Sequence, residues 1–285
     1  MSTHILYNPK SNNRTGTAAA EALKAKLGDV ADMTDVTTVT DVSAYFAQFP
    51  ADDRFYLVGG DGTLNHFVND VEGVALPEEV YFCGAGTGND FLRDLGTAPD
   101  EPVLIGKYIK HLPTVTINGK TMRFINGIGF GIDGYCCETG DKMRETTDKP
   151  INYTSIAIKG LLFHFSPRNA TVTVDGVTKE YKKVWIAPTM NGRYYGGGMM
   201  AAPDQDRLKN DTVTTVLMYG KGRLRTLMAF PSIFKGEHVN HTEQVEVIKG
   251  RDVTVKFDQP TALQIDGETV LDVTEYRVTA AGSAS

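Results

Sequence analysis

The sequence predicts an α/β domain with a parallel sheet, followed by a mostly antiparallel β domain. Strand-like and helix-like segments alternate over the first part of the chain, which is typical of a parallel sheet with helices on both faces. Beyond residue 112, short segments rich in β-branched residues flank tight-turn signals instead. We therefore expect two domains, over residues 1–112 and 113–285.

Composition narrows the classes of function. The formal net charge of −6 over 285 residues argues against a nucleic-acid partner, which would favour a basic footprint. A nucleotide ligand is compatible with this negative charge, because Mg²⁺ and backbone N–H groups offset the charge of the phosphates. The N-terminus lacks a signal-peptide pattern, and no apolar run reaches the length of a membrane span. Three cysteines form no disulfide framework, so we expect a cytoplasmic protein.

The first domain reads in order as strands joined by helices. Strands are expected at His4–Asn8, Asp32–Val39, Phe55–Val58 and Val80–Cys83. Helices are expected at Thr17–Leu27, at Asp41–Phe49 with Asp41 as the cap, at Leu64–Glu72, at Leu92–Leu95 and at Pro102–His111. Residues 9–16 read as a polar loop. In such sheets a ligand lies beyond the carboxyl ends of the strands.

Two glycine-rich turns lie at that edge, and both end in carboxylates. Gly59-Gly60-Asp61-Gly62-Thr63-Leu64-Asn65 follows an apolar strand and precedes apolar residues at helical spacing. Gly84-Ala85-Gly86-Thr87-Gly88-Asn89-Asp90-Phe91 is the second such turn. A strand, glycine turn and helix in succession present N–H groups to a phosphate, whereas a carboxylate there would hold Mg²⁺ or take a proton. The pair predicts a site that binds a nucleoside triphosphate and moves a phosphoryl group.

The second domain reads as a β-sandwich or open barrel. Asn118-Gly119 and Asp175-Gly176 are strong hairpin signals between β-type segments. Further strands are expected at Trp185–Pro188, Thr212–Tyr219, Gln244–Ile248, Asp252–Phe257 and Thr261–Ile265, with helical insertions at Ile151–Phe165 and Leu224–Phe234. Gly129–Gly134 matches a dinucleotide-binding pattern but shows no clear helix after it, so we expect a turn there.

These motifs together resemble the diacylglycerol kinase catalytic domain family, which includes soluble bacterial lipid kinases and the sphingosine and ceramide kinases. The resemblance rests on the two glycine turns, on Asn8-Pro9-Lys10-Ser11, on the Phe124–Phe130 segment and on Asp266-Gly267-Glu268, all in the expected order. It implies a Rossmann-like α/β domain with a parallel sheet, then an antiparallel β-sandwich domain, with the active site in the cleft between the domains. It also implies ATP and Mg²⁺ as cofactors and a lipid hydroxyl as acceptor, with diacylglycerol as the default lipid.

The resemblance implies roles for individual residues. The implied ATP-binding set is Asn8, Pro9, Lys10, Ser11, Asn12, Thr37, Gly59, Gly60, Asp61, Gly62, Thr63, Leu64, Asn65, Thr87 and Asn89. Asp61 and Asp90 would face the metal-bound phosphates. Glu268, with Asp266 beside it, would deprotonate the lipid hydroxyl, and Asp61 is the competing candidate for that base.

One loop departs from the family pattern. Bacterial members usually carry Leu-Asp-Asp-Gly in a loop that holds a structural Mg²⁺, whereas this chain has Arg207-Leu208-Lys209-Asn210-Asp211-Thr212. The metal ligands implied here are Arg207, Asn210 and Thr212. Asparagine supplies an oxygen without charge, and Asp211 is an alternative ligand.

A lipid substrate implies contact with a membrane surface. The apolar stretch 151–165, and the basic residues around Leu224, suit transient docking at anionic headgroups on the inner face of a membrane. The alternative is that residues 151–165 form an ordinary packed helix. The sequence leaves open whether the protein forms a homodimer.

Two rival functions share these motifs. NAD kinases carry the same Gly-Gly-Asp-Gly-Thr turn, but Gly-Thr-Gly-Asn-Asp-Phe stands where they have an Asn-Gly segment running into Leu-Gly-Phe. A non-catalytic lipid or nucleotide sensor on the same fold is the other. Retention of Asp61, Asp90 and Glu268 favours an enzyme over a sensor.

Overall fold

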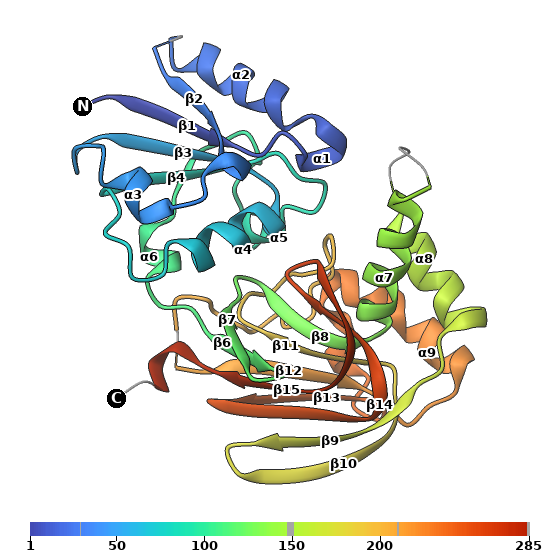
Figure 1. Ribbon diagram of the computed structural model, residues 1–285. Helices are drawn as coiled ribbons and strands as arrows, with labels where there is room; N and C mark the ends of the chain where they lie inside the picture. The colour runs from blue at the N-terminus through green and yellow to red at the C-terminus, as the bar shows by residue number, and fades with distance from the viewer. Residues whose placement is uncertain (29, 147–150, 210, 284–285) are drawn as a thin grey trace. The chain divides into compact units, whose positions relative to one another are not determined.

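The computed structural model describes residues 1–28, 30–146, 151–209 and 211–283. The chain divides into two compact units, Met1–Lys110 and His111–Ser285, which we call unit 1 and unit 2. Unit 1 contains a five-stranded sheet and unit 2 a ten-stranded sheet (Figure 1). No helix in the described ranges combines the length and the apolar character needed to cross a bilayer.

Unit 1 is an α/β unit. Its strands are β1 (Thr3–Tyr7), β2 (Asp32–Asp35), β3 (Arg54–Gly59), β4 (Glu79–Gly84) and β5 (Val103–Leu104), and its helices are α1 (Ser11–Arg14), α2 (Gly16–Lys26), α3 (Val42–Phe46), α4 (Asp61–Asp70), α5 (Asp90–Leu95) and α6 (Gly106–Ile109), with a 3₁₀ turn η1 (Val36–Thr38). The sheet order is β2-β1-β3-β4-β5. The first four strands are parallel, as predicted, and β5 pairs antiparallel with β4 at the edge.

Helices cover both faces of this sheet (Figure 1). On one face, Ala20 and Leu23 of α2 pack against β1, β3 and β4. On the other face, Phe46 of α3 lies with its ring centroid 5.0 Å from that of Phe55 on β3 and 6.3 Å from that of Phe67 on α4. The predicted cap of α3 is confirmed, because the Asp41 carboxylate accepts the Ala44 N–H at 2.8 Å.

Three local expectations in unit 1 were wrong. The strand expected over Asp32–Val39 is shorter, because β2 ends at Asp35 and residues Val36–Thr38 form the 3₁₀ turn η1. Residues 9–16 are not simply a loop, since α1 makes one helical turn there and α2 begins at Gly16. The helix expected over Pro102–His111 is shorter, because Val103 and Leu104 pair with Phe82 and Tyr81 before α6 begins. The short antiparallel strand covers an edge of β4 that would otherwise be unpaired.

Unit 2 is an antiparallel β unit with helical insertions. Its strands are β6 (Thr114–Ile117), β7 (Lys120–Arg123), β8 (Gly127–Gly131), β9 (Arg168–Val174), β10 (Val177–Val184), β11 (Ile186–Met190), β12 (Val213–Met218), β13 (Val245–Gly250), β14 (Asp252–Ile265) and β15 (Glu268–Thr279). Its helices are α7 (Ile132–Arg144), α8 (Tyr153–Lys159) and α9 (Arg223–Ala229), with a π-helical turn η2 (Gly160–His164) and 3₁₀ turns η3 (Phe230–Lys235), η4 (Glu237–Asn240) and η5 (Ala281–Ser283).

The strands of unit 2 form one hydrogen-bonded network, in the order β13-β12-β11-β8-β14-β15-β6-β7 with the β9–β10 hairpin joined to β14. Strand β14 organises this network. It pairs with β15 over both of its halves, while its first half also pairs with β9 and its second half with β8. The sequence predicted two strands here, over 252–257 and 261–265, whereas the structure has one strand with an irregular register between Lys256 and Thr261.

Three hairpins of unit 2 use the same turn chemistry. The turn residues have positive φ in pairs: 50° and 78° at Asn118-Gly119, 49° and 83° at Asp175-Gly176, and 48° and 93° at Asp266-Gly267. Both central residues of a type I′ turn need positive φ, which asparagine, aspartate and glycine adopt at low cost. The two hairpins predicted at residues 118–119 and 175–176 are confirmed.

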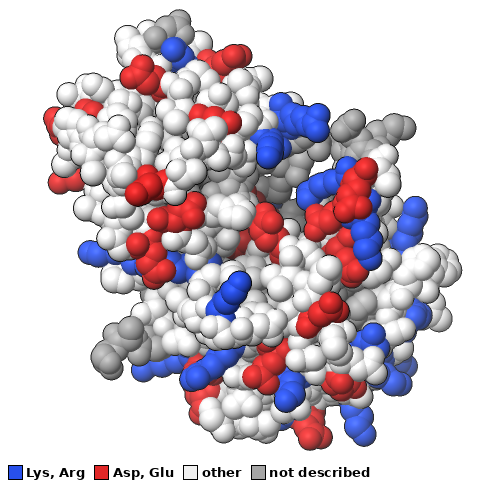
Figure 2. Space-filling view, in the orientation of Figure 1, with Lys and Arg blue, Asp and Glu red and all other residues white. Residues whose placement is uncertain are grey.

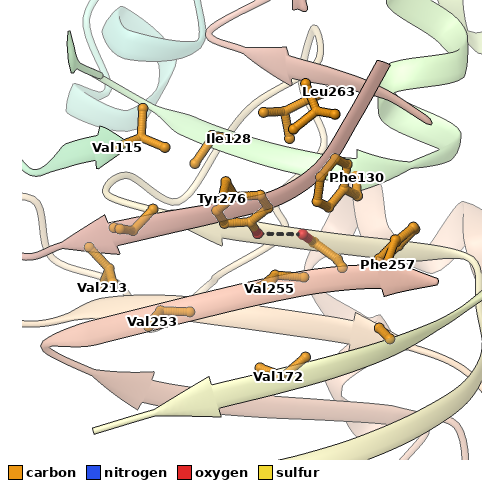
Figure 3. Packing of buried hydrophobic residues seen from close by; sticks show 14 of the residues in the cluster. Val115, Ile128, Phe130, Val172, Val213, Val253, Val255, Phe257, Leu263 and Tyr276 are labelled. Atoms are coloured by element: carbon orange, nitrogen blue, oxygen red, sulfur yellow. Dashed lines mark hydrogen bonds between the residues drawn. The ribbon is translucent and has the colours of Figure 1, made fainter. Parts of the chain in front are cut away.

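The β strands enclose one apolar core and the helices of unit 2 cover a second. In the first, Phe130, Phe257 and Tyr276 meet in the interior (Figure 3). The Tyr276 hydroxyl lies 3.0 Å from Thr189 Oγ1. Tyr276 Oη also donates to the Ala187 carbonyl at 2.8 Å, which satisfies a buried polar atom. In the second core, residues such as Leu161 and Phe230 pack against the sheet.

The turn expected at Gly129–Gly134 was also wrong. Strand β8 ends at Gly131, and the thirteen-residue helix α7 begins at Ile132. Gly131 has φ 108°, and a Cβ there would meet the Trp185 backbone, so glycine is required. Helix α7 buries Ile132, Cys136 and Gly140 at four-residue spacing. The small size of its buried residues explains why the apolar periodicity was weak.

Candidate functional site

The loops predicted to bind a nucleotide gather at one edge of the unit 1 sheet. Strands β1 to β4 are parallel, so the loops that follow them all leave from the same edge. The chain leaves β1 toward β2 on one side and later returns to β3 on the other side of β1. This reversal is a topological switch point, where sheets of this class bind ligands. The loops after β1 and β3 flank it.

Those two loops are joined by side chains. Asn8 Nδ2 donates to Thr63 Oγ1 at 3.0 Å, and Ser11 Oγ lies 3.1 Å from the same Thr63 oxygen. Asn8 also holds its own loop, because its Oδ1 accepts the Lys10 N–H at 3.0 Å. Thr63 is buried in the first turn of α4. The structure therefore brings together Asn8, Ser11 and Thr63, three of the residues implied to bind ATP.

The two glycine turns pack backbone to backbone. A Cβ on Gly86 would lie 2.8 Å from the Gly60 Cα, and a Cβ on Gly60 would lie 3.3 Å from the Gly86 Cα. The Ala85 N–H also donates to the Gly59 carbonyl at 2.7 Å. Neither turn can carry a side chain at the contact without moving the other. The glycines thus fix the spacing of the two turns.

Asn89 and Asp61 hold the second turn in shape. Asn89 adopts left-handed backbone at φ 49°, and its amide bridges the turn: Oδ1 accepts the Gly86 N–H at 3.1 Å, and Nδ2 donates to the Gly86 carbonyl at 2.8 Å. Asp61 accepts the N–H groups of Asp90 and Phe91 at 2.9 and 3.0 Å. The carboxylate of the first turn therefore caps the helix that begins after the second.

The remaining predicted residues of unit 1 lie at or near this edge. Thr87 is exposed on the second turn, and Asp90 is buried at the start of α5. The Thr37 N–H and hydroxyl both donate to Asp35 Oδ1, at 2.9 and 2.7 Å, just beyond the end of β2. The side chain of Leu64 is fully buried in the core, and that of Asn65 is also buried.

Further members of the implied set lie at the turns themselves. Pro9 and Lys10 occupy the loop after β1, and Asn12 lies in α1. Gly62 lies in the first turn of α4, where the backbone N–H groups have no acceptor within the helix.

In unit 2, Asp266 anchors a distant backbone segment. Its carboxylate accepts the N–H groups of Ile125, Asn126 and Gly127 at 2.5, 2.8 and 2.9 Å. The residue is buried in the turn between β14 and β15. Three N–H donors on one carboxylate favour a positioning role for Asp266.

Glu268 begins β15, two residues after that anchor. Its side chain is exposed, and its backbone pairs with Ile265 across the hairpin. The neighbouring Thr269 hydroxyl donates to Asp141 of α7 at 2.6 Å, which ties this end of β15 to the helix. The hairpin thus presents Glu268 on a fixed backbone.

The sequence did not single out the network around Asn126. The buried Arg207 guanidinium donates to Asn126 Oδ1 at 3.0 Å and to the Ile125 carbonyl at 3.3 Å. Asn191 Nδ2 donates to the same carbonyl at 2.8 Å. Together with Asp266, these side chains bind backbone donors and acceptors of segment 125–127. No local pattern indicates this, since the partners are 66 to 141 residues apart.

The predicted structural metal loop is partly described. Arg207 directs its guanidinium into the Asn126 network, and the Thr212 carbonyl accepts the Gln205 amide at 3.1 Å. Asn210, the central predicted ligand, lies outside the described residues. Within the ranges that the structure describes, no group of three or more histidine, cysteine, aspartate or glutamate side chains could hold a metal ion.

A second buried carboxylate of unit 2, Asp133, was not predicted. It lies in the first turn of α7, and within the described part of the chain neither of its oxygens has a hydrogen-bond partner. Burial raises the pKa of Asp133 to about 7. Burial also raises the pKa of the neighbouring Tyr195 well above its usual value.

Chemically, the unit 1 edge suits an anionic ligand. It offers the first-turn N–H groups of α4 and glycines in both turns that let a ligand approach the backbone. The partly exposed carboxylate of Asp61 suits a cation that accompanies such a ligand. Unit 2 offers an exposed carboxylate, Glu268, on a hairpin held by Asp266. The chain thus contains groups that are chemically able to bind phosphate and groups that are able to accept a proton.

Two family models match the chain in order. The diacylglycerol kinase catalytic domain matches residues 2–117. The YegS C-terminal domain, described as NAD kinase beta sandwich-like, matches residues 126–280. The residues matched by the first model include both glycine turns, and the residues matched by the second include Asp266 and Glu268.

Individual proteins match over most of the chain. YtlR of Bacillus subtilis (strain 168), provisionally named a lipid kinase, is 26% identical over 249 residues, covering 81% of this chain and 78% of YtlR. A diacylglycerol kinase of Mycobacterium tuberculosis (strain ATCC 25618 / H37Rv) is 27% identical over 216 residues, covering 73% of this chain and 67% of that protein.

A solved structure has the same fold. The crystal structure of a protein from Bacillus anthracis str. Sterne, provisionally titled a diacylglycerol kinase, matches with a TM-score of 0.68 and 17% identity. The match covers 98% of this chain and 91% of that one. It confirms the predicted fold class, an α/β unit with a parallel sheet followed by an antiparallel β unit.

Proposed function

We propose that this chain, which belongs to the diacylglycerol kinase catalytic domain family, is an ATP-dependent kinase that transfers the γ-phosphoryl group to a lipid hydroxyl. Diacylglycerol is the default acceptor. The observation that best supports the proposal is Asp61. Its carboxylate is locked by two N–H groups of α5, yet its side chain stays partly exposed beside the first turn of α4. A fixed acidic group next to a phosphate-binding turn is what phosphoryl transfer uses.

The residues present fit a nucleotide with Mg²⁺. Gly60 and Gly62 leave the start of α4 open to phosphate oxygens, and Asn8 and Ser11 hold the adjoining loop. Mg²⁺ in kinases uses one or two carboxylates together with substrate phosphates, so a cluster of three acidic side chains is not required. Asp61 and Asp90 are the residues we assign to it. When bound, the ion neutralises charge on the β- and γ-phosphates.

Unit 2 supplies the acceptor side of the proposal. We assign Glu268 as the base that takes the proton of the lipid hydroxyl, because its carboxylate is exposed at the start of β15. Asp266 acts through the backbone, since its carboxylate is occupied by three N–H groups. Asp61 stays the competing base. A positioned base contributes about 10²–10⁴-fold to the rate.

The proposal includes a location. All three cysteines, Cys83, Cys136 and Cys137, are free, which suits a reducing compartment. We place the protein in the cytoplasm, working at the inner face of a membrane where its lipid resides.

A label-transfer assay tests this function. The purified chain is incubated with γ-labelled ATP, Mg²⁺ and either mixed lipid micelles or NAD, and the products are separated by solvent extraction. We expect label in the organic phase, highest with diacylglycerol within a panel of lipid alcohols. Label in a dinucleotide would favour the NAD kinase alternative, and label in neither product would favour the non-catalytic sensor.

A matched pair of variants checks that the activity belongs to this site. Asp61→Asn is expected to abolish transfer. Asp70→Asn removes an exposed carboxylate at the far end of the same helix and is expected to leave transfer unchanged. Substantial activity in Asp61→Asn would refute the role assigned to Asp61.

A further inference from the structure

Helices α8 and α9 and the turn η2 between strands of unit 2 carry large apolar side chains that point to solvent. Phe163 is 70% exposed, Leu224 73% and Met228 75%, and Ile158 is 40% exposed. We call these four residues and the cations around them the α8–α9 surface. Large exposed apolar side chains are unusual when they gather on adjoining elements, and such gatherings mark interaction sites.

These side chains belong to one surface because their elements are joined. The Arg223 guanidinium at the start of α9 donates to the Leu161 carbonyl in η2 at 2.8 Å. Leu224 and Met228 are four residues apart and therefore lie on the same side of α9. Thr226 and Ala229 of the same helix are buried. Helix α9 thus presents an apolar outer side in addition to its packed inner side.

The same segments are positively charged. Residues 153–164 and 221–235 contain Lys159, Lys221, Arg223, Arg225 and Lys235 and no aspartate or glutamate, although the whole chain has a net charge of −6. Lys159, Arg225 and Lys235 are exposed. In Figure 2 the edge of unit 2 that carries α8 and α9 in Figure 1 shows uncharged atoms with blue side chains among them, and red side chains adjoin them on the side of α7.

The inner side of this surface is firmly packed. Leu161 is fully buried, Phe165 lies with its ring centroid 6.1 Å from that of Trp185, and Arg223 lies over the Trp185 ring at 5.7 Å. The elements are therefore held against the sheet by residues other than those exposed. Substituting the exposed side chains is expected to leave the fold intact.

We propose that the α8–α9 surface docks on a bilayer that contains anionic lipid, with Phe163, Leu224 and Met228 entering the headgroup region and Lys159, Arg225 and Lys235 contacting lipid phosphates. The inference rests on the proposed function, whose lipid acceptor lies in a membrane, and it names the partner of that reaction. Apolar side chains ringed by cations are the pattern of interfacial membrane contact. A cationic patch on an acidic chain selects an anionic partner.

Vesicle flotation of the full chain tests the docking directly. Vesicles contain phosphatidylcholine alone or phosphatidylcholine with about one third phosphatidylglycerol, an anionic fraction large enough for a surface potential to act. We expect the chain to float with the anionic vesicles, and to float less as salt is raised, because salt screens the cations. Failure to float with anionic vesicles would overturn the proposal.

Two sets of variants assign the contact to this surface. Phe163→Ser with Leu224→Ser and Met228→Ser is expected to weaken binding by about tenfold or more, since each apolar side chain loses its burial. Its control, Val177→Ser with Leu271→Ser, removes side chains that are 67% and 55% exposed on other strands and is expected to bind like the wild type.

The second set changes charge. Lys159→Glu with Arg225→Glu is expected to abolish the preference for anionic vesicles. Its control, Lys120→Glu with Lys182→Glu, makes the same change in net charge at exposed positions on β7 and β10. Equal losses in the test and control pairs would overturn the proposal, because net charge rather than this surface would then explain binding.

Turnover separates this proposal from the proposed function. With a short-chain diacylglycerol dissolved as monomers, the surface variants are expected to keep wild-type transfer, whereas transfer to long-chain diacylglycerol in anionic vesicles is expected to fall with binding.

Flotation without transfer to any lipid would refute the kinase function and support the docking. Transfer from vesicles that is unaffected by the surface variants would overturn the docking and leave the kinase function standing. A dimer in solution that the serine variants dissociate, without flotation, would also overturn it.

Discussion

Gly60 and Gly86 show how single residues set the geometry of the candidate nucleotide site. Their backbones lie in contact, which leaves no room for a Cβ on Gly86 and only a tight fit for one on Gly60. The sequence predicted that both turns need glycine for phosphate approach. The structure adds a second reason, which is that the two turns must approach each other.

Substitution of Gly86 tests this contact. Gly86→Ala places a Cβ 2.8 Å from the Gly60 Cα, so the turns must separate. We expect the free energy of unfolding to fall by about 1–3 kcal/mol, the usual cost of overpacking, and the KM for ATP to rise. Gly106→Ala is the matched control, since its Cβ would meet nothing within 4 Å and its stability and KM are expected to stay close to wild type. Equal behaviour of the two variants would contradict the proposed contact.

Asp133 gives the protein a predicted pH dependence. The pKa of this buried carboxyl is raised from 3.8 to about 7. Between those values the unfolded chain releases the proton while the folded protein retains it, so stability falls as pH rises. Above pH 7 both states are ionised and the loss is complete.

The variant Asp133→Asn removes that titration. From pH 5 to pH 8, we expect the free energy of unfolding of the wild type to fall by about 3 kcal/mol more than that of Asp133→Asn. Urea unfolding at a series of pH values measures the difference. Parallel pH profiles for the two proteins would show that Asp133 is ionised in the folded state throughout.

At the scale of elements, Thr63 couples the loop after β1 to helix α4. Its hydroxyl is shared by Asn8 and Ser11. Thr63→Val keeps the shape and removes the hydroxyl, so we expect a loss of about 1–3 kcal/mol of stability and weaker ATP binding measured by calorimetry. Thr40→Val, at an exposed position, serves as the control. Unchanged ATP affinity in Thr63→Val would show that the loop is not part of the nucleotide site.

The elements that the sequence predicted best are those with local chemical signals. Asn118-Gly119 and Asp175-Gly176 each supply the two positive φ values of a tight hairpin, and Asp41 supplies a helix cap. Helix α7 was missed, because its buried side includes Cys136 and Gly140 in place of large apolar residues. Gly134 sits against the Ala262 backbone and Gly140 against the Tyr153 ring, contacts that only the folded chain creates.

The candidate site was predictable in its residues and less so in their contacts. Glycine turns after apolar strands identified the loops around Asp61 and Asn89. Asp61 caps α5 through a contact between residues that are 29 positions apart in the sequence. Asp266 holds segment 125–127 through contacts between residues that are about 140 positions apart. Such contacts follow from the packing of strands, which one sequence does not show. The roles of Asp61, Asp90, Asp266 and Glu268 in catalysis stay predictions.

At the scale of the whole molecule, the residues proposed for the reaction are divided between the two units. Unit 1 carries the edge proposed to bind phosphate, and unit 2 carries the exposed Glu268 and the α8–α9 surface. Net negative charge over the chain coexists with a local cationic surface on unit 2. This distribution suits a protein that must orient one part of itself toward anionic lipid.

Because the proposed roles are divided between the units, we expect substitution of a carboxylate in unit 1 and in unit 2 to impair different steps. Glu268→Gln is expected to bind ATP with Mg²⁺ like the wild type, because all residues assigned to nucleotide binding lie in unit 1. Asp61→Asn is expected to lose both nucleotide affinity and transfer. Calorimetry with a non-hydrolysable ATP analogue provides the binding half of this comparison.

The rate of phosphoryl transfer from labelled ATP to diacylglycerol by Glu268→Gln, measured at saturating ATP, tests the central claim most directly. The account predicts a rate about 10²–10⁴-fold below that of the wild type, with nucleotide affinity unchanged. A rate within about threefold of the wild type would contradict it, because the unit 2 carboxylate would then play no part in accepting the proton of the lipid hydroxyl.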